Sequence, residues 1–199
     1  DEITSSGSVK LRIRSLIESI KLRGDDYKPF LIKREKVAVF EEIDKNKKIL
    51  APVFSPFYTD FLVSTVRNLG YDLEILPLAD RKSIEIGLKY SNNDICYPAT
   101  IVIGDLIKAL QSGNYDLENV AVGLTQTGGQ CRASSYVSML KKALVRAGFS
   151  HVPVIAISTH TTGDKLHLQP GFKLPDSFKL DSLFGIIYAD VLARFYYSH

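Results

Sequence analysis

The chain has 199 residues, of which 45% are hydrophobic and 24% charged, and its formal net charge is +3. This composition is typical of a globular domain with its own core, and no apolar run reaches the roughly 18 residues that a membrane helix requires. Intermixed charges argue against a nucleic-acid-binding patch, while two cysteines and the absence of a signal-peptide core at the start argue against a secreted, disulfide-held domain and predict a cytoplasmic protein.

The chain begins with an amphipathic helix. Apolar side chains recur at helical spacing between residues 9 and 20, which gives one apolar stripe: Val9, Ile13, Leu16, Ile17 and Ile20. Residues 23–46 are mixed and charged and indicate a connector, although residues 36–40 have the composition of a strand. We therefore expect an N-terminal helix and connector over residues 1–47 and an α/β domain over residues 48–199.

Strands and helices then alternate. Residues 49–54 and 72–76 have the composition of strands. Between them, residues 58–69 have helical periodicity, and Gly70 is placed to end that helix. A strand, a helix and a second strand therefore follow one another in this region.

Two further helices are predicted from their end signals. Asp80 can cap a helix over residues 81–89, because its carboxylate can accept a hydrogen bond from the first turn. Pro98 suits the first turn of the next helix, which runs to about Gln111.

The last part of the chain continues the pattern. Residues 120–124 and 152–157 are apolar enough to be buried strands, and a helix over residues 131–147 lies between them and closes at Gly148. Residues 177–197 form a final apolar helix, in which we expect the many Phe and Tyr side chains to pack against the rest of the domain.

This alternation predicts the fold class. Helices that follow strands must cover a sheet face, which favours parallel strands joined by right-handed crossovers. We expect an α/β fold with an open, three-layer, mainly parallel sheet and helices on both faces, of the Rossmann-like type.

Cys96 is the first residue with chemical potential. It lies directly before the helix that Pro98 begins, and the partial positive charge of a helix N-terminus favours the thiolate that ligates metals or attacks carbon. A single cysteine is also often a small buried hydrophobic residue.

The loop after residue 124 is the second candidate. It joins a buried strand to a helix, the place where open α/β sheets bind ligands. Gly128 and Gly129 allow a close backbone approach, Cys131 opens the helix, and Arg132 supplies a cation.

Three chemistries fit this loop. Phosphate binding is the weakest, because the loop lacks the endings of the known phosphate-binding motifs. Cys131 could be a nucleophile with a histidine as base, although Ala133 replaces the glycine expected two residues later. Cys96 and Cys131 could instead converge as thiolate ligands, although an iron–sulfur cluster usually has four. The chain has four candidate bases: His151, His160, His167 and His199.

Two longer motifs suggest a family. The motifs are YSNNDICYPA at residues 90–99 and TQTGGQCRASSY at residues 125–136. Together they resemble the large activase-related proteins of the 2-hydroxyacyl-CoA dehydratase system, in their dehydratase-like segment. The resemblance extends over about residues 49–196, and residues 1–47 carry little of it.

The resemblance implies a segment of a longer polypeptide, in which a separate ATP-binding activase domain drives electrons into a [4Fe–4S] cluster that acts on an acyl-CoA substrate. Cys96 and Cys131 match the cluster ligands, while Gly128, Gly129 and Arg132 would line the cofactor site. An isolated segment is expected to lack the cluster. No nucleic acid or membrane partner is expected. The alternatives are a non-catalytic module that docks the activase domain and a transferase with Cys131 as nucleophile.

Overall fold

The structure is a computed structural model, and it describes the chain except for residues 1–4, 24–35, 93–94, 127–130, 158–168 and 199. The chain divides into two compact units, Asp1–Arg34 and Glu35–His199. The first unit contains helix α1 (Ser5–Arg23), which confirms the predicted N-terminal helix. All the apolar side chains of its predicted stripe are exposed within this unit: Val9, Ile13, Leu16, Ile17 and Ile20.

The second unit is built on a four-stranded sheet in which every strand pairing is parallel. The strand order is β2-β1-β3-β4, so β1 and β3 form the centre. Ile49 of β1 lies opposite Leu73 of β2 and Ala121 of β3. The strands are β1 (Lys48–Ala51), β2 (Asp72–Ile75), β3 (Val120–Thr125) and β4 (Val154–Ile157).

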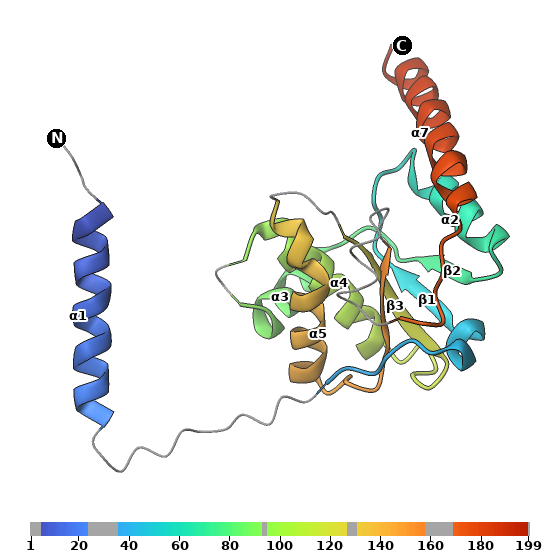
Figure 1. Cartoon of the computed structure of the whole chain (residues 1–199). Coiled ribbons are helices and arrows are strands. Elements are labelled where there is room, and N and C mark those ends of the chain that lie inside the picture. The colour runs from blue at the N-terminus through green and yellow to red at the C-terminus, as the bar shows by residue number, and fades with distance from the viewer. Residues whose placement is uncertain (1–4, 24–35, 93–94, 127–130, 158–168, 199) are drawn as a thin grey trace. The chain divides into compact units, whose positions relative to one another are not determined.

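Helices cover both faces of this sheet, as Figure 1 shows. Successive side chains of a strand point to opposite faces, so Leu50 joins the core beneath α3, α4 and α5, whereas Ile49 and Ala51 join the core beneath α2. The predicted open, three-layer α/β fold is therefore confirmed. The helices are α2 (Thr59–Asn68), α3 (Arg81–Tyr90), α4 (Tyr97–Gln111), α5 (Tyr136–Ala147) and α7 (Asp176–Tyr197).

The α/β unit begins earlier in the chain than residue 48. Phe40 is fully buried in its core, and the carbonyl oxygen of Phe40 accepts a hydrogen bond of 3.0 Å from the Gly171 amide. The amide of Ala38 donates to the carbonyl oxygen of Ser150 at 2.8 Å. Because these bonds reach two separate segments, residues 36–40 are not a strand, and that prediction is wrong; a short 3-10 helix, η1 (Glu42–Asn46), follows them.

Helices α3 and α4 form a tightly packed antiparallel pair. A Cβ atom added to Gly104 would overlap the carbonyl oxygen of Ser83, and one added to Gly87 would overlap that of Thr100. The two backbones therefore touch at glycine positions. This close approach holds α4, with Cys96 at its start, in a fixed position relative to α3.

A polar network closes the same helix pair at the start of α3. The carboxylate of Asp80 accepts a hydrogen bond of 2.9 Å from the Ser83 amide, as expected of an N-cap, and one of 3.1 Å from the Lys108 ammonium group of α4. The Ser83 amide, and after it Lys108, lower the pKa of Asp80 from 3.8 to about 2.

This shift predicts a pH dependence of stability. The pKa of Asp80 is lower in the folded than in the unfolded chain, so its contribution is complete above pH 3.8 and is lost as the pH falls through about 2. Asp80→Asn keeps an N-cap residue. We expect this variant to be less stable than the wild type above pH 3.8 and to approach the stability of the wild type as the pH falls through about 2. Urea unfolding at a series of pH values measures this, and a difference that does not change with pH would contradict it.

Helix α7 exposes most of its apolar side chains. It packs along α2 on a side of small residues, where a Cβ atom on Gly185 would lie 3.2 Å from Cβ of Phe61 and Ala189 is fully buried. The prediction that its aromatic side chains pack against the domain is wrong for the exposed Phe184 and Phe195. It is confirmed for Phe178, which is buried, and for the rings of Tyr196 and Tyr197, whose centroids lie 5.5 and 6.0 Å from that of Phe57. No helix among the described residues is both long enough and apolar enough to cross a bilayer.

Candidate functional site

The carboxyl edge of the sheet is where the candidate residues gather. In a doubly wound sheet, ligands bind where connections from neighbouring strands run in opposite directions. The order β2-β1-β3-β4 places that point between β1 and β3. Thr125 ends β3 at this edge, and Cys131 precedes the helical segment that leads into α5. Residues 127–130 of the predicted loop lie outside the described residues.

Cys96 is the N-cap residue of α4, as the proline signal predicted. Pro98 occupies the first turn, and the carbonyl oxygen of Cys96 accepts hydrogen bonds from the amides of Ala99 and Thr100. The Cys96 side chain is half-buried. Its thiol therefore lies at the positive end of a helix of 15 residues.

Cys131 is exposed and precedes a short 3-10 helix, η2 (Arg132–Ser135), which leads directly into α5. The amide of Ala133 donates to the Cys131 sulfur at 3.5 Å, and the Ser134 hydroxyl donates to the Cys131 carbonyl oxygen at 2.8 Å. The predicted helix over residues 131–147 thus consists of a 3-10 turn followed by an α-helix. Gly128 and Gly129 lie outside the described residues, as does the side chain of Arg132.

Tyr136 contacts the first of the two cysteines. Its hydroxyl oxygen lies 3.0 Å from the Cys96 sulfur. Burial first, then the hydrogen bond to Cys96 and negative charge on Cys96 and Cys131, together raise the pKa of Tyr136 to about 12. The Cys96 sulfur therefore lies beside a phenol that keeps its proton at neutral pH and can donate it to that sulfur.

Sequence reasoning did not single out Tyr136. Tyr136 is the first residue of α5, and α5 packs beside α4, whose N-cap is Cys96. The contact joins residues that are far apart in the sequence. A hydroxyl-bearing aromatic residue at the start of an amphipathic helix is a weak local signal for it.

Of the histidines proposed as bases, His151 is the one that the structure describes, and it lies away from this site. His151 precedes β4 and thus lies at the amino edge of the sheet, opposite the edge that carries Cys131. His160, His167 and His199 lie outside the described residues. Within the described ranges, no three residues of the types His, Cys, Asp and Glu come together as a possible metal site.

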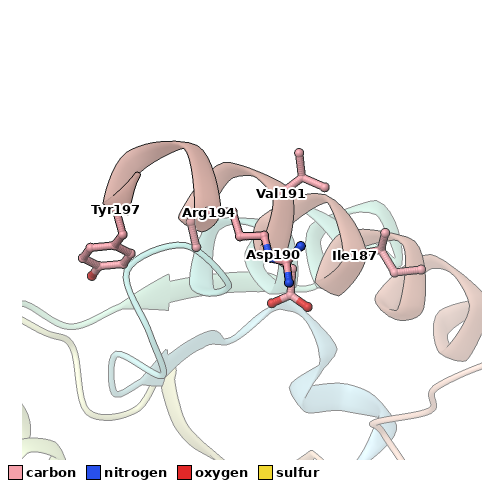
Figure 2. A pocket seen from close by; sticks show the side chains of 6 residues that line it. Ile187, Asp190, Val191, Arg194 and Tyr197 are labelled. Atoms are coloured by element: carbon pink, nitrogen blue, oxygen red, sulfur yellow. The ribbon is translucent and has the colours of Figure 1, made fainter. Parts of the chain in front are cut away.

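A separate hollow of about 530 Å³ runs along α7 (Figure 2). Asp190 and Arg194 project from the same side of that helix, and Asp190 accepts a hydrogen bond from the Tyr58 hydroxyl. A single helix supplies all the lining side chains, whereas binding sites draw polar groups from several elements. This hollow is therefore part of the exposed side of α7 rather than a second candidate site.

Comparisons with protein-family models, with curated proteins and with solved structures found no match to this chain.

Proposed function

We propose that Cys96 and Cys131 are thiolate ligands of an iron–sulfur centre that serves one-electron transfer. The observation that supports the proposal is the position of both cysteines at the starts of helical segments on the ligand-binding edge of the sheet. The Cys96 sulfur lies 3.0 Å from the hydroxyl of Tyr136, and Cys131 lies just before the helix that Tyr136 begins. Thiolates are the usual ligands of iron–sulfur clusters, and α/β proteins bind their ligands at this edge.

The donor atoms fit a cluster, but the chain supplies only part of the set. Clusters usually have four cysteine ligands, and the whole sequence contains two cysteines. Other ligands must therefore come from a further polypeptide or from donors other than cysteine. A bound cluster would supply the electron-accepting and electron-donating chemistry.

Hydrogen-bond donors beside the two sulfurs would tune the reduction potential of a bound cluster. Hydrogen bonds to cluster sulfurs tune the reduction potential, and the amide of Ala133 and the hydroxyl of Tyr136 are available to the sulfurs of Cys131 and Cys96. The raised pKa of Tyr136 keeps that hydroxyl protonated. By the motif resemblance, the electrons would come from an ATP-hydrolysing activase domain and be used on an acyl-CoA substrate.

Anaerobic reconstitution with iron and sulfide tests the assignment. We expect the chain, together with whatever partner completes the ligand set, to gain visible absorption and, after reduction, an EPR signal. Cys96→Ser and Cys131→Ser should each reduce the bound iron at least about tenfold, since loss of even an outer-sphere partner weakens metal binding by that order. Unchanged iron content in both variants would contradict the proposal.

Tyr136→Phe is the matched control for the thiol variants. It removes a hydroxyl that lies 3.0 Å from the Cys96 sulfur but leaves both ligands in place. We expect this variant to keep its iron and to have a lower reduction potential, because one hydrogen bond to sulfur stabilises the reduced, more negative cluster.

A module that docks the activase domain is a second candidate function. The exposed apolar side chains of α7 favour it, because a helix that is apolar on most sides is normally covered by another protein surface. Docking requires neither sulfur, so the two cysteine variants distinguish this function from the first. A transferase with Cys131 as nucleophile has support from the exposure of that thiol, and its candidate bases, His160 and His167, lie outside the described residues.

A further inference from the structure

An apolar cavity that is partly open to solvent lies between α2, α7 and the ends of the central strands. Its volume is about 280 Å³. Aromatic side chains form much of its wall, among them Phe54, Phe61 and Phe178, and Ile157 closes the end of β4. The cavity is distinct from the hollow along the outer side of α7.

The position of this cavity matches that of small-molecule sites in related architectures. Phe54 follows β1, and Gln126 follows β3, which are the two central strands of the sheet. Open α/β sheets bind ligands at this crossover point, because the loops on either side of it diverge and leave a crevice. In this protein α7 lies beside that crevice, and its residues Ser182, Gly185 and Ile186 form part of the cavity wall.

Two buried polar atoms in the cavity wall have no hydrogen-bond partner among the described residues. They are Oε1 of Gln126, at the end of β3, and Oγ of Ser182, on α7. Buried polar atoms are almost always paired, because burying them without a partner is costly. Neither atom is accessible to solvent, so each side chain must turn toward the cavity to meet a ligand. Two such atoms in residues that line one apolar cavity point to a ligand that pairs with them once both side chains have turned.

The chemistry of the two atoms restricts the ligand. A carbonyl oxygen can only accept a hydrogen bond, and a serine hydroxyl can donate one or accept one. A hydroxyl group satisfies both atoms, since it donates to Gln126 and accepts from Ser182. None of the side chains found to line the cavity is charged, so an ionised ligand would lose its hydration without gaining a counter-ion.

We propose that this cavity is a binding site for a neutral, mainly apolar alcohol or phenol, with the ligand hydroxyl between Gln126 and Ser182. An apolar cavity of roughly 150 Å³ holds benzene, so one of 280 Å³ has room for two fused rings or a comparable aliphatic group. The site is separate from the thiols and does not depend on the redox proposal.

Three probes of equal ring size test the proposal: 1-naphthol, naphthalene and 1-naphthoate. Binding is followed through the methyl NMR resonances of Ile157 and Ile186, which line the cavity, and of Leu140, which belongs to the core on the other face of the sheet. We expect 1-naphthol to shift the first two resonances and not that of Leu140. It should bind about tenfold more tightly than naphthalene, as a satisfied pair of buried polar groups allows, and naphthoate should bind least.

Two variants assign the preference to the two polar atoms. Gln126→Met keeps the size of the side chain and removes the acceptor, and Ser182→Ala removes only a hydroxyl. We expect each variant to keep naphthalene binding and to reduce the preference for 1-naphthol to a few-fold or less. Because Ser182→Ala is a small change to an alanine-compatible helix, it remains informative if Gln126→Met does not fold.

Several outcomes would overturn the proposal. These are no shift at Ile157 or Ile186 with any probe, equal affinity for 1-naphthol and naphthalene, and a 1-naphthol preference that survives in both variants. Tighter binding of naphthoate than of 1-naphthol would also overturn it. Cys96→Ser and Cys131→Ser should leave 1-naphthol binding unchanged, so the result is read independently of the iron–sulfur proposal.

Discussion

Replacing Gly104 with alanine is expected to lower the free energy of unfolding of the α/β unit by about 3 kcal/mol or more. The added Cβ would overlap the carbonyl oxygen of Ser83 and approach the backbone nitrogen of Gly87, so α3 and α4 would have to move apart. Overpacking of this kind typically costs about 1–3 kcal/mol and sometimes more. Backbone atoms cannot rotate away as a flexible side chain can. We therefore expect the destabilisation at Gly104 to lie at the upper end of this energy range.

The gain in helix propensity does not offset that loss. Alanine is favoured over glycine within a helix by about 1 kcal/mol. Urea or thermal unfolding, followed by circular dichroism, measures the net effect. Gly87→Ala should behave in the same way, because its Cβ would overlap the carbonyl oxygen of Thr100.

Two other glycines in helices provide matched controls. A Cβ on Gly7 of α1 has no atom within 4 Å, so Gly7→Ala should leave the unfolding of the α/β unit unchanged. A Cβ on Gly185 of α7 would lie 3.2 Å from Cβ of Phe61, so Gly185→Ala should have an intermediate effect. Equal stabilities for the Gly104, Gly185 and Gly7 variants would show that the α3–α4 contact is looser than described.

Most helix boundaries could be predicted because their signals are local. Asp80 caps α3 through the Ser83 amide, and Pro98 lies in the first turn of α4. Gly70 and Gly148 follow α2 and α5 with φ of 86° and 83°, a conformation that glycine adopts without the steric cost that other residues incur. Each signal acts within one turn of the chain, so no knowledge of the tertiary structure is needed.

The predictions that were wrong concern contacts between distant segments. Residues 36–40 have the composition of a strand, but the hydrogen bonds of Ala38 and Phe40 go to Ser150 and Gly171. Whether an extended segment joins a sheet depends on which segment lies beside it, and composition does not contain that information.

Helix α7 illustrates the same limit for packing. Its large side chains suggested a packed helix, yet its backbone approaches α2 most closely at Gly185, Ala189 is fully buried, and Phe184 and Phe195 remain exposed. Small residues allow close helix contact, so apolar size alone does not identify the packed side of a helix.

The candidate site was predictable in part. The positions of Cys96 and Cys131 at the starts of helical segments follow from local sequence, and the structure has them there. Tyr136 and the unpaired atoms of Gln126 and Ser182 depend on how α4, α5 and α7 pack. Such contacts join residues far apart in the chain and leave little trace in its local pattern.

The largest electrostatic effect is expected at Lys108. Its ammonium group lies 3.2 Å from a carboxylate oxygen of Asp105, which is almost fully buried, and 2.8 Å from the Ser83 hydroxyl. Burial lowers the pKa of Lys108, but hydrogen bonds to Asp80 and Asp105 outweigh that effect and raise it, so the lysine remains charged. The ammonium group is the cation that compensates the buried carboxylate.

Lys108→Met is therefore expected to lower the free energy of unfolding by about 2–3 kcal/mol. Removing one partner of a buried ion pair costs about 3–5 kcal/mol, and the partial exposure of the Lys108 side chain reduces that figure. The loss comes mainly from the Asp105 carboxylate, which stays buried beside the Ser83 hydroxyl without a cation.

A double-mutant cycle with Asp105→Asn tests that cause. Asparagine keeps an acceptor for the Ser83 hydroxyl, which donates to Asp105 at 2.9 Å, but carries no charge. If the uncompensated charge is the reason for the loss, the double variant should be more stable than Lys108→Met alone, with a coupling energy of about 1–3 kcal/mol. Additive effects of the two substitutions would instead assign the loss to the packing of the Lys108 side-chain methylenes.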